Sequence, residues 1–228
     1  MSYEAVIEDC YLHLKNMGRT RESLKILAVS KLQPLQKIKK LYEIGHRHFA
    51  ENYIQEALLK QVSLKDLALE WHFIGNLQRN KVKLAVGNFE FIHSVDSLEL
   101  AQAISAQAVK TNTTQKILLQ VNLAQEITKG GFSAESLRAT WHEVCQLSGI
   151  SITGLMTMPP LTDDPEDVRP YFQQLSVLQV ELMKQARGRH SLHELSMGTS
   201  HDYHVAIEEG ATIVRLGTIL FGERPRKN

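Results

Sequence analysis

The chain has 228 residues, of which 43% are hydrophobic and 22% are charged, and its formal net charge at pH 7 is +1. This apolar content supports a sizeable core and excludes an intrinsically disordered chain, and the length fits one large α/β domain or two small ones. The near-zero net charge gives no excess of basic residues for binding nucleic acid, so we expect no nucleic-acid partner.

The N-terminus and the cysteines favour a cytoplasmic location. The first five residues, MSYEA, carry neither a basic leader nor an apolar segment, and no apolar run of the sequence reaches the length of a membrane span. Cys10 and Cys145 lie in helix-like segments and are typical of reduced, buried residues rather than of a disulfide framework. We therefore expect a soluble cytoplasmic protein with no membrane partner.

The chain begins with an amphipathic pattern and then alternates between short apolar runs and helical patterns. The stripe of the predicted first helix consists of Tyr3, Ile7, Tyr11 and Leu14, with Val6 and Cys10 beside it. The eight runs that we expect to form strands are 26–30, 48–50, 71–74, 91–95, 116–121, 150–156, 193–196 and 212–216.

Helix-start signals follow several of these runs. Pro34 is expected at the first position of the helix after the first strand, and Asp96 or Ser97 is expected to cap the helix after the fourth. Apolar strands that alternate with helices predict a parallel sheet covered on both faces. Eight such units favour a single (βα)8 TIM-type barrel over 1–228 with an extra N-terminal helix, and a doubly wound open sheet is the alternative.

Lys31 follows the first apolar strand, at the end where barrel enzymes build their sites. Partial dehydration there disfavours the ammonium form, which frees the amine for Schiff-base chemistry. The alternative interpretation is a solvent-exposed lysine that only ends a strand.

Other candidate site residues follow or end the later strands. These are Asn52, His72, Met156, Ser196, Ser200 and the run from Arg215 to Thr218. The Gly217-Thr218 turn offers backbone N–H groups and a hydroxyl to an anion, and Ser200 would add a second hydroxyl. The alternative for this segment is an ordinary glycine turn.

Arg215 is predicted on the last strand, where burying a guanidinium is costly unless it meets an acceptor. A pyridine ring nitrogen would serve as that acceptor. The alternative is a salt bridge to a carboxylate at a strand end, such as Glu51.

Two further patterns carry weaker signals. His201 and His204 have helical spacing and could clip a metal, but the sequence offers no evident third ligand, so cap or solvent-facing histidines are favoured and no metal is expected. The Lys129-Gly130-Gly131 segment is either a mobile loop whose lysine reaches the mouth of the site or a flexible turn.

Taken together, the motifs resemble those of the pyridoxal phosphate homeostasis protein family, single-domain barrels that are similar to the N-terminal barrel of alanine racemase and other fold-type III proteins. The matching stretches are LAVSK at 27–31, ENYIQE at 51–56, WHFIG at 71–75, GLM at 154–156, SMG at 196–198 and VRLGT at 214–218. They occur in the expected order and span the chain from about residue 27 to residue 222.

This resemblance implies that the cofactor is pyridoxal 5'-phosphate (PLP) and assigns roles to its binding residues. Lys31 would form the Schiff base, and Arg215 would face the pyridine nitrogen. The phosphate would be held by Ser200, Gly217 and Thr218, and the pocket would be lined by Asn52, Met156 and Ser196.

A bound cofactor need not imply catalysis. Arginine keeps its proton, so a ring nitrogen facing Arg215 stays an unprotonated acceptor and the electron sink of PLP is weakened. The chain also ends at Asn228, and we expect no second domain with an opposing acid/base group.

The sequence therefore predicts a monomeric PLP-binding protein that acts in vitamin B6 homeostasis. It would store PLP, buffer it or deliver it to PLP-dependent apoenzymes, with an indirect effect on amino and keto acids and little or no turnover. The alternatives are a weak PLP-dependent amino-acid racemase or lyase with Lys31 as base, and an aldolase in which Lys31 attacks a sugar carbonyl.

Overall fold

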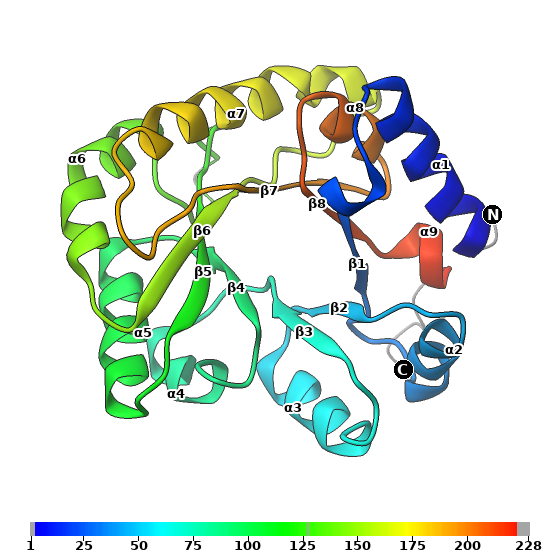
Figure 1. Cartoon of the computed structure of the whole chain (residues 1–228), viewed down its shortest axis with the longest axis horizontal. Coiled ribbons are helices and arrows are strands. Elements are labelled where there is room, and N and C mark those ends of the chain that lie inside the picture. Colours follow the sequence, from blue (N-terminus) through cyan, green and yellow to red (C-terminus); the bar gives the residue numbers. More distant parts are fainter. Residues whose placement is uncertain (1–2, 127, 223–228) are drawn as a thin grey trace.

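The computed structural model describes residues 3–126 and 128–222, and within them eight parallel strands close into a barrel in sequence order (Figure 1). The strands are β1 Lys25–Val29, β2 His48–Glu51, β3 Glu70–Phe73, β4 Phe91–Val95, β5 Gln115–Gln120, β6 Ile150–Met156, β7 Glu194–Thr199 and β8 Ile213–Leu216. Pairing of β1 with β8 closes the barrel, so the predicted (βα)8 architecture is confirmed and the open-sheet alternative is wrong.

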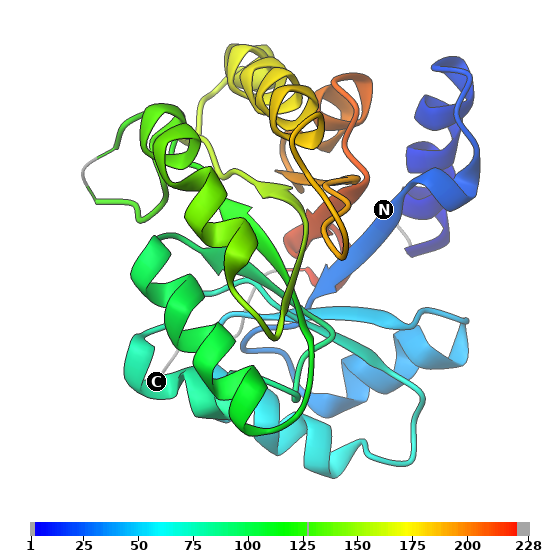
Figure 2. The same ribbon diagram turned by 60° about the vertical axis from the view of Figure 1, so that its left-hand side comes forward.

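Helices cover the outside of the barrel, and α1 lies on this outer surface, where it packs against α8 and α9 (Figure 2). The α-helices are α1 Tyr3–Asn16, α2 Leu35–Glu43, α3 Ile54–Ser63, α4 Val82–Ala85, α5 Leu98–Lys110, α6 Ala134–Gln146, α7 Arg169–Met183, α8 Tyr203–Glu208 and α9 Thr218–Phe221. Short 3-10 turns lie at Arg21–Ser23, Arg79–Lys81 and Pro165–Val168. Within the described ranges, every helix is too short or too polar to cross a bilayer.

The helix starts agree with the sequence signals in part. Ser97 caps α5 by accepting a hydrogen bond from the backbone N–H of Leu100. Pro34 occupies the position before α2 rather than its first turn, because its extended backbone (ψ 152°) lies outside the helical region. The fully buried stripe of α1 is Val6, Cys10 and Leu14, an i, i+4 row, and the two cysteines of the chain are free thiols.

The barrel interior combines an apolar cluster with buried polar side chains. The apolar cluster is formed by Leu27, Ala50, Phe91, Leu118, Met156 and Ile213. Barrel interiors are usually filled by branched apolar residues, whereas here His72, His93, Ser196 and Arg215 are buried as well. Buried polar groups need partners, and those partners shape the site at the carboxyl ends of the strands.

Candidate functional site

A cavity of about 360 Å³ opens at the carboxyl ends of the barrel strands, the face where sites of this architecture lie. Seven of the residues predicted from the sequence line it: Lys31, Asn52, Met156, Ser200, Arg215, Gly217 and Thr218. Larger hollows of about 510 and 580 Å³ include residues from the first positions of β1, β2 and β3 at the opposite face. We assign the candidate site to the smaller cavity because, of these three hollows of the described structure, it is the one lined by Lys31, Arg215 and the Gly217-Thr218 turn together.

Lys31 lies at the corner of a tight turn that follows β1. The backbone N–H of Gln33 donates to the carbonyl of Ser30 at 3.0 Å, so Lys31 and Leu32 are the central residues of the turn. Leu32 has a φ of +59°, a left-handed conformation that costs free energy for a residue other than glycine. Such a conformation persists only where surrounding contacts hold it.

Those contacts come from a buried charge cluster beneath the turn. The Lys60 ammonium donates to the Ser30 carbonyl at 2.6 Å, to Glu51 Oε1 at 2.7 Å and to Glu56 Oε1 at 2.6 Å. Glu56 Oε1 also accepts the backbone N–H of Leu32 at 2.7 Å. The cluster thus fixes the backbone on both sides of Lys31.

Glu51 forms its ion pair with Lys60 and not with Arg215, so the alternative of an Arg215–Glu51 salt bridge is wrong. The Glu51 side chain is fully buried, and burial raises the pKa of its carboxyl even though Lys60 and the Ser30 hydroxyl oppose the shift. The sequence reasoning missed Lys60, because a lysine within the helix α3 carries no sequence signal of burial.

Arg215 is 5% exposed and donates hydrogen bonds to two oxygen atoms inside the barrel. Its Nη1 donates to Ser196 Oγ and its Nη2 to the Thr157 carbonyl, both at 2.8 Å. Burial lowers the pKa of Arg215 to about 10, a shift that Asp202 partly opposes, so the guanidinium stays protonated at neutral pH. Ser196 lies within β7 and is fully buried beneath Arg215, so in the described structure it is not among the cavity-lining residues.

The Gly217-Thr218 turn is held by a residue that follows β7. Ser200 Oγ accepts the backbone N–H groups of Gly217 and Ile219 at 3.1 and 3.4 Å. Asp202 Oδ1 in turn accepts the backbone N–H and the hydroxyl of Thr199 at 2.5 and 3.0 Å. The Ser200 contacts join the segments after β7 and β8, as the sequence predicted.

Asn52 presents a buried acceptor at the cavity. Its Oδ1 is buried and has no hydrogen-bond partner among the described residues. The loop after β3 approaches closely here, because a Cβ at Gly75 would lie only 2.0 Å from the Asn52 carbonyl oxygen. An unsatisfied buried acceptor beside a cavity fits a ligand that donates a hydrogen bond.

The mouth of the cavity carries apolar side chains that the sequence reasoning missed. Met158 and Leu161 line it, and Leu161 is 86% exposed. The Lys129 ammonium donates to the carbonyls of Met158 and Pro159 at 3.3 and 3.1 Å and pairs with Glu126. In this structure the lysine therefore bridges two loops at the rim.

The two histidines considered as a metal clip have different neighbours. His201 lines the cavity, whereas His204 bonds to Asp9 and stacks on His13 at 4.0 Å between ring centroids. In the described residues a second cluster, around Glu70 at the amino-terminal face, brings His48 and His72 onto one carboxylate. The ammonium of Lys25 occupies that same oxygen at 2.7 Å, which is the arrangement of an ion-pair network.

Comparison with known proteins adds a family match and close relatives. Residues 13–225 match the family described as alanine racemase, N-terminal domain. A protein of Aquifex aeolicus named pyridoxal phosphate homeostasis protein is 47% identical over 96% of this chain and 95% of its own length. One of the same name from Pseudomonas aeruginosa is 41% identical over 91% of this chain and 87% of its own.

Solved structures agree with the fold. PipY of Synechococcus elongatus, solved with PLP bound, is 40% identical and superposes with a TM-score of 0.83 over 93% of this chain and all of that one. An alanine racemase of Clostridium difficile is 19% identical and superposes with a TM-score of 0.73 over 97% of this chain and 57% of its own. At that identity the second likeness supports the barrel fold alone.

Proposed function

The chain belongs to the alanine racemase N-terminal domain family and, within it, to the pyridoxal phosphate homeostasis proteins, and from this membership we propose that it binds PLP in the cavity at the carboxyl ends of its strands. We propose further that residues 1–228 form one cofactor-binding domain that acts in the homeostasis of vitamin B6. The names of the relatives and the PLP-bound structure of PipY support this proposal.

One observation carries the proposal: a single cavity joins an amine, a protonated guanidinium and a turn of N–H and hydroxyl groups. These groups match the aldehyde, ring nitrogen and phosphate of PLP in chemical type. Asn52 Oδ1 adds an acceptor that no other described residue satisfies. The amine, the guanidinium and the turn therefore fit the cofactor.

Five residues of the cavity have assigned tasks in this proposal. When bound, PLP supplies an aldehyde that captures amines and a ring that accepts electrons. Lys31 would hold the aldehyde carbon covalently, with the carbonyl oxygen leaving as water, and Gly217, Thr218 and Ser200 would hold the phosphate. Arg215 keeps its proton because its pKa stays near 10, and it therefore donates a hydrogen bond without giving up the proton.

That retained proton favours storage over turnover. A ring nitrogen that accepts from arginine lacks the positive charge that strengthens an electron sink. We propose that the protein stores, buffers or delivers PLP to apoenzymes, as a cytoplasmic monomer with little or no turnover. The two free thiols support the location.

The visible spectrum of the isolated protein, before and after borohydride reduction, tests the proposal. We expect a cofactor absorbance band that reduction abolishes, and a PLP-sized mass increase confined to the peptide that contains Lys31. Protein that stays colourless and gains no mass after incubation with PLP would contradict PLP binding. Incubation of the loaded protein with L-amino acids tests the rival racemase or lyase activity, since sustained racemisation or keto-acid release would contradict the storage role.

Thr218→Val is expected to weaken PLP affinity about tenfold, because one hydrogen bond to a charged phosphate contributes about 1.5 kcal/mol or more. The substitution keeps the branched shape and removes only the hydroxyl. Fluorescence titration with PLP measures the affinity. Thr140→Val, on the exposed face of α6 where the hydroxyl bonds to its own helix, is the matched control and should not change it. Equal affinity in the Thr218 variant would place the phosphate elsewhere.

A further inference from the structure

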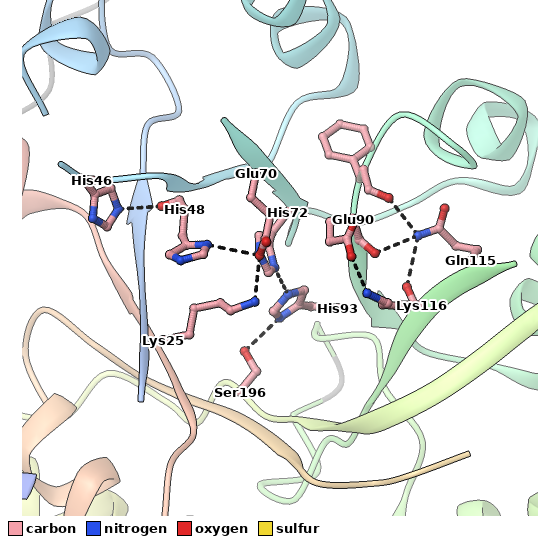
Figure 3. Close-up of polar contacts among 11 residues, drawn as sticks. Lys25, His46, His48, Glu70, His72, Glu90, His93, Gln115, Lys116 and Ser196 are labelled. Atoms are coloured by element: carbon pink, nitrogen blue, oxygen red, sulfur yellow. Dashed lines mark hydrogen bonds and ion pairs between the residues drawn. The ribbon is translucent and has the colours of Figure 1, made fainter. Parts of the chain in front are cut away.

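A row of hydrogen-bonded polar side chains crosses the barrel interior from Glu70 at the amino-terminal face to Ser196 (Figure 3). Arg215, which lines the cavity, donates to Ser196 and continues the row. In order, the row consists of Glu70, His72, His93, Ser196 and Arg215. Glu70 Oε1 lies 2.7 Å from His72 Nε2, His72 Nδ1 lies 2.8 Å from His93 Nε2, and His93 Nδ1 lies 2.9 Å from Ser196 Oγ. The three middle side chains are all 0% exposed, so each depends on its neighbours in the row.

The carboxylate at the first position of the row is held in its charged form. Burial alone would raise the pKa of Glu70, but hydrogen bonds from His48, His72 and Lys25 outweigh it and hold the pKa well below its usual range. Lys25 donates to Glu70 Oε1 at 2.7 Å, and His48 Nδ1 lies 3.1 Å from the same oxygen. A charged carboxylate only accepts hydrogen bonds, so Glu70 imposes a direction on whatever contacts it.

Both histidines of the row are neutral at neutral pH. Burial lowers the pKa of His72 to about 4, although Glu70 opposes the shift, and burial lowers the pKa of His93 well below its usual value. A neutral imidazole carries one N–H and one acceptor nitrogen.

The direction set by Glu70 therefore passes along the row. His72 carries its hydrogen on Nε2, which leaves Nδ1 to accept from His93 Nε2. His93 Nδ1 then accepts the Ser196 hydroxyl hydrogen, and Ser196 Oγ is left to accept from Arg215.

We infer that Glu70, His72 and His93 are positioning residues, which fix Arg215 in the cavity from the opposite face of the barrel through one oriented hydrogen-bond chain. The inference rests on the proposed function for the importance of Arg215, but the orientation of the chain is a property of the protein alone. With the opposite tautomer, His93 would donate to Ser196 together with Arg215. The fully buried hydroxyl hydrogen would then lose its acceptor, at a cost in free energy.

Glu70→Gln tests the orientation in protein free of PLP. A glutamine amide both donates and accepts, so it no longer imposes one direction on the chain. In 15N-labelled wild-type protein we expect both ring hydrogens on Nε2, and in the variant we expect the signals of His93 to move toward a mixture of tautomers. Glu90→Gln is the matched control, because Glu90 pairs with Lys116 on the same face but lies outside the row.

A double-mutant cycle tests the coupling to the cavity. Glu70→Gln is expected to weaken PLP affinity about two- to tenfold, the range of one hydrogen bond. In a Ser196→Ala background, where Arg215 is disconnected from the chain, the same change should cost nothing further. Additive losses would mean that Glu70 acts independently of Arg215 and would overturn the inference.

The outcomes separate this inference from the proposed function. Unchanged His93 tautomers in Glu70→Gln overturn the inference and leave PLP binding intact. Failure of the wild type to bind PLP overturns the proposed function, while the spectra recorded without PLP still decide the orientation of the chain.

Discussion

Lys31→Ala is expected to abolish the covalent adduct with PLP entirely. Alanine has no amine, so borohydride has no bond to reduce and the mass of the peptide stays unchanged. Residual, reversible binding through Ser200, Gly217 and Thr218 should remain, because the phosphate contacts do not involve Lys31. Mass analysis after reduction measures the first effect, and dialysis followed by absorbance measures the second.

The same substitution should also reduce the stabilisation that PLP gives to the fold. A ligand at one hundred times its dissociation constant stabilises a protein by about 2.7 kcal/mol, and weaker binding lowers that gain at equal concentration. We therefore expect PLP to raise the melting temperature of the wild type by more than that of Lys31→Ala.

Lys129→Ala is the matched control, since Lys129 is the other lysine placed at the rim by its contact with the Met158 carbonyl. It should keep the adduct and its absorbance. An adduct that survives in Lys31→Ala and disappears in Lys129→Ala would show that Lys129, and not Lys31, forms the covalent bond.

The placement of the site was predictable because strand ends in a barrel converge. Lys31, Asn52, Met156 and Arg215 follow or end apolar runs, and closure of the barrel brings them to one cavity. Ser200 and Gly217 were predictable for the same reason, as neighbours after β7 and β8.

The supporting contacts were not predictable, because they depend on the register and on which face each strand side chain occupies. Ser196 reads as a residue after a strand, yet β7 continues to Thr199 and turns its hydroxyl beneath Arg215. His93 sits in an apolar run and gives no polar signal until β4 is placed opposite β7 inside the barrel. Lys60 reads as one more helix lysine until α3 folds over the end of β1.

Lys60→Met is expected to destabilise the fold by about 3 to 5 kcal/mol, because it removes one partner of a buried ion pair and leaves the other charge uncompensated. The Lys60 side chain is 7% exposed and that of Glu51 is fully buried, so water does not replace the lost contact. The Ser30 carbonyl and Glu56 Oε1 lose a donor as well. Urea unfolding at pH 7 measures the loss against Lys39→Met, an exposed lysine on α2 that should change stability by less than about 0.5 kcal/mol.

The loss should also depend on pH in a defined direction. Burial raises the pKa of Glu51 and Lys60 opposes the rise, so removing Lys60 raises that pKa further. A carboxyl with a raised pKa in the folded state contributes most stability while it is protonated, and that contribution is lost as the pH rises through its folded pKa. Lys60→Met should therefore cost less at pH 5 than at pH 8, and adding Glu51→Gln should recover part of the stability at pH 8. A loss of less than about 1 kcal/mol in the free energy of unfolding, or a loss that increases as the pH falls, would contradict this. It would show that buried charge in the cluster does not hold the turn at Lys31 and Leu32.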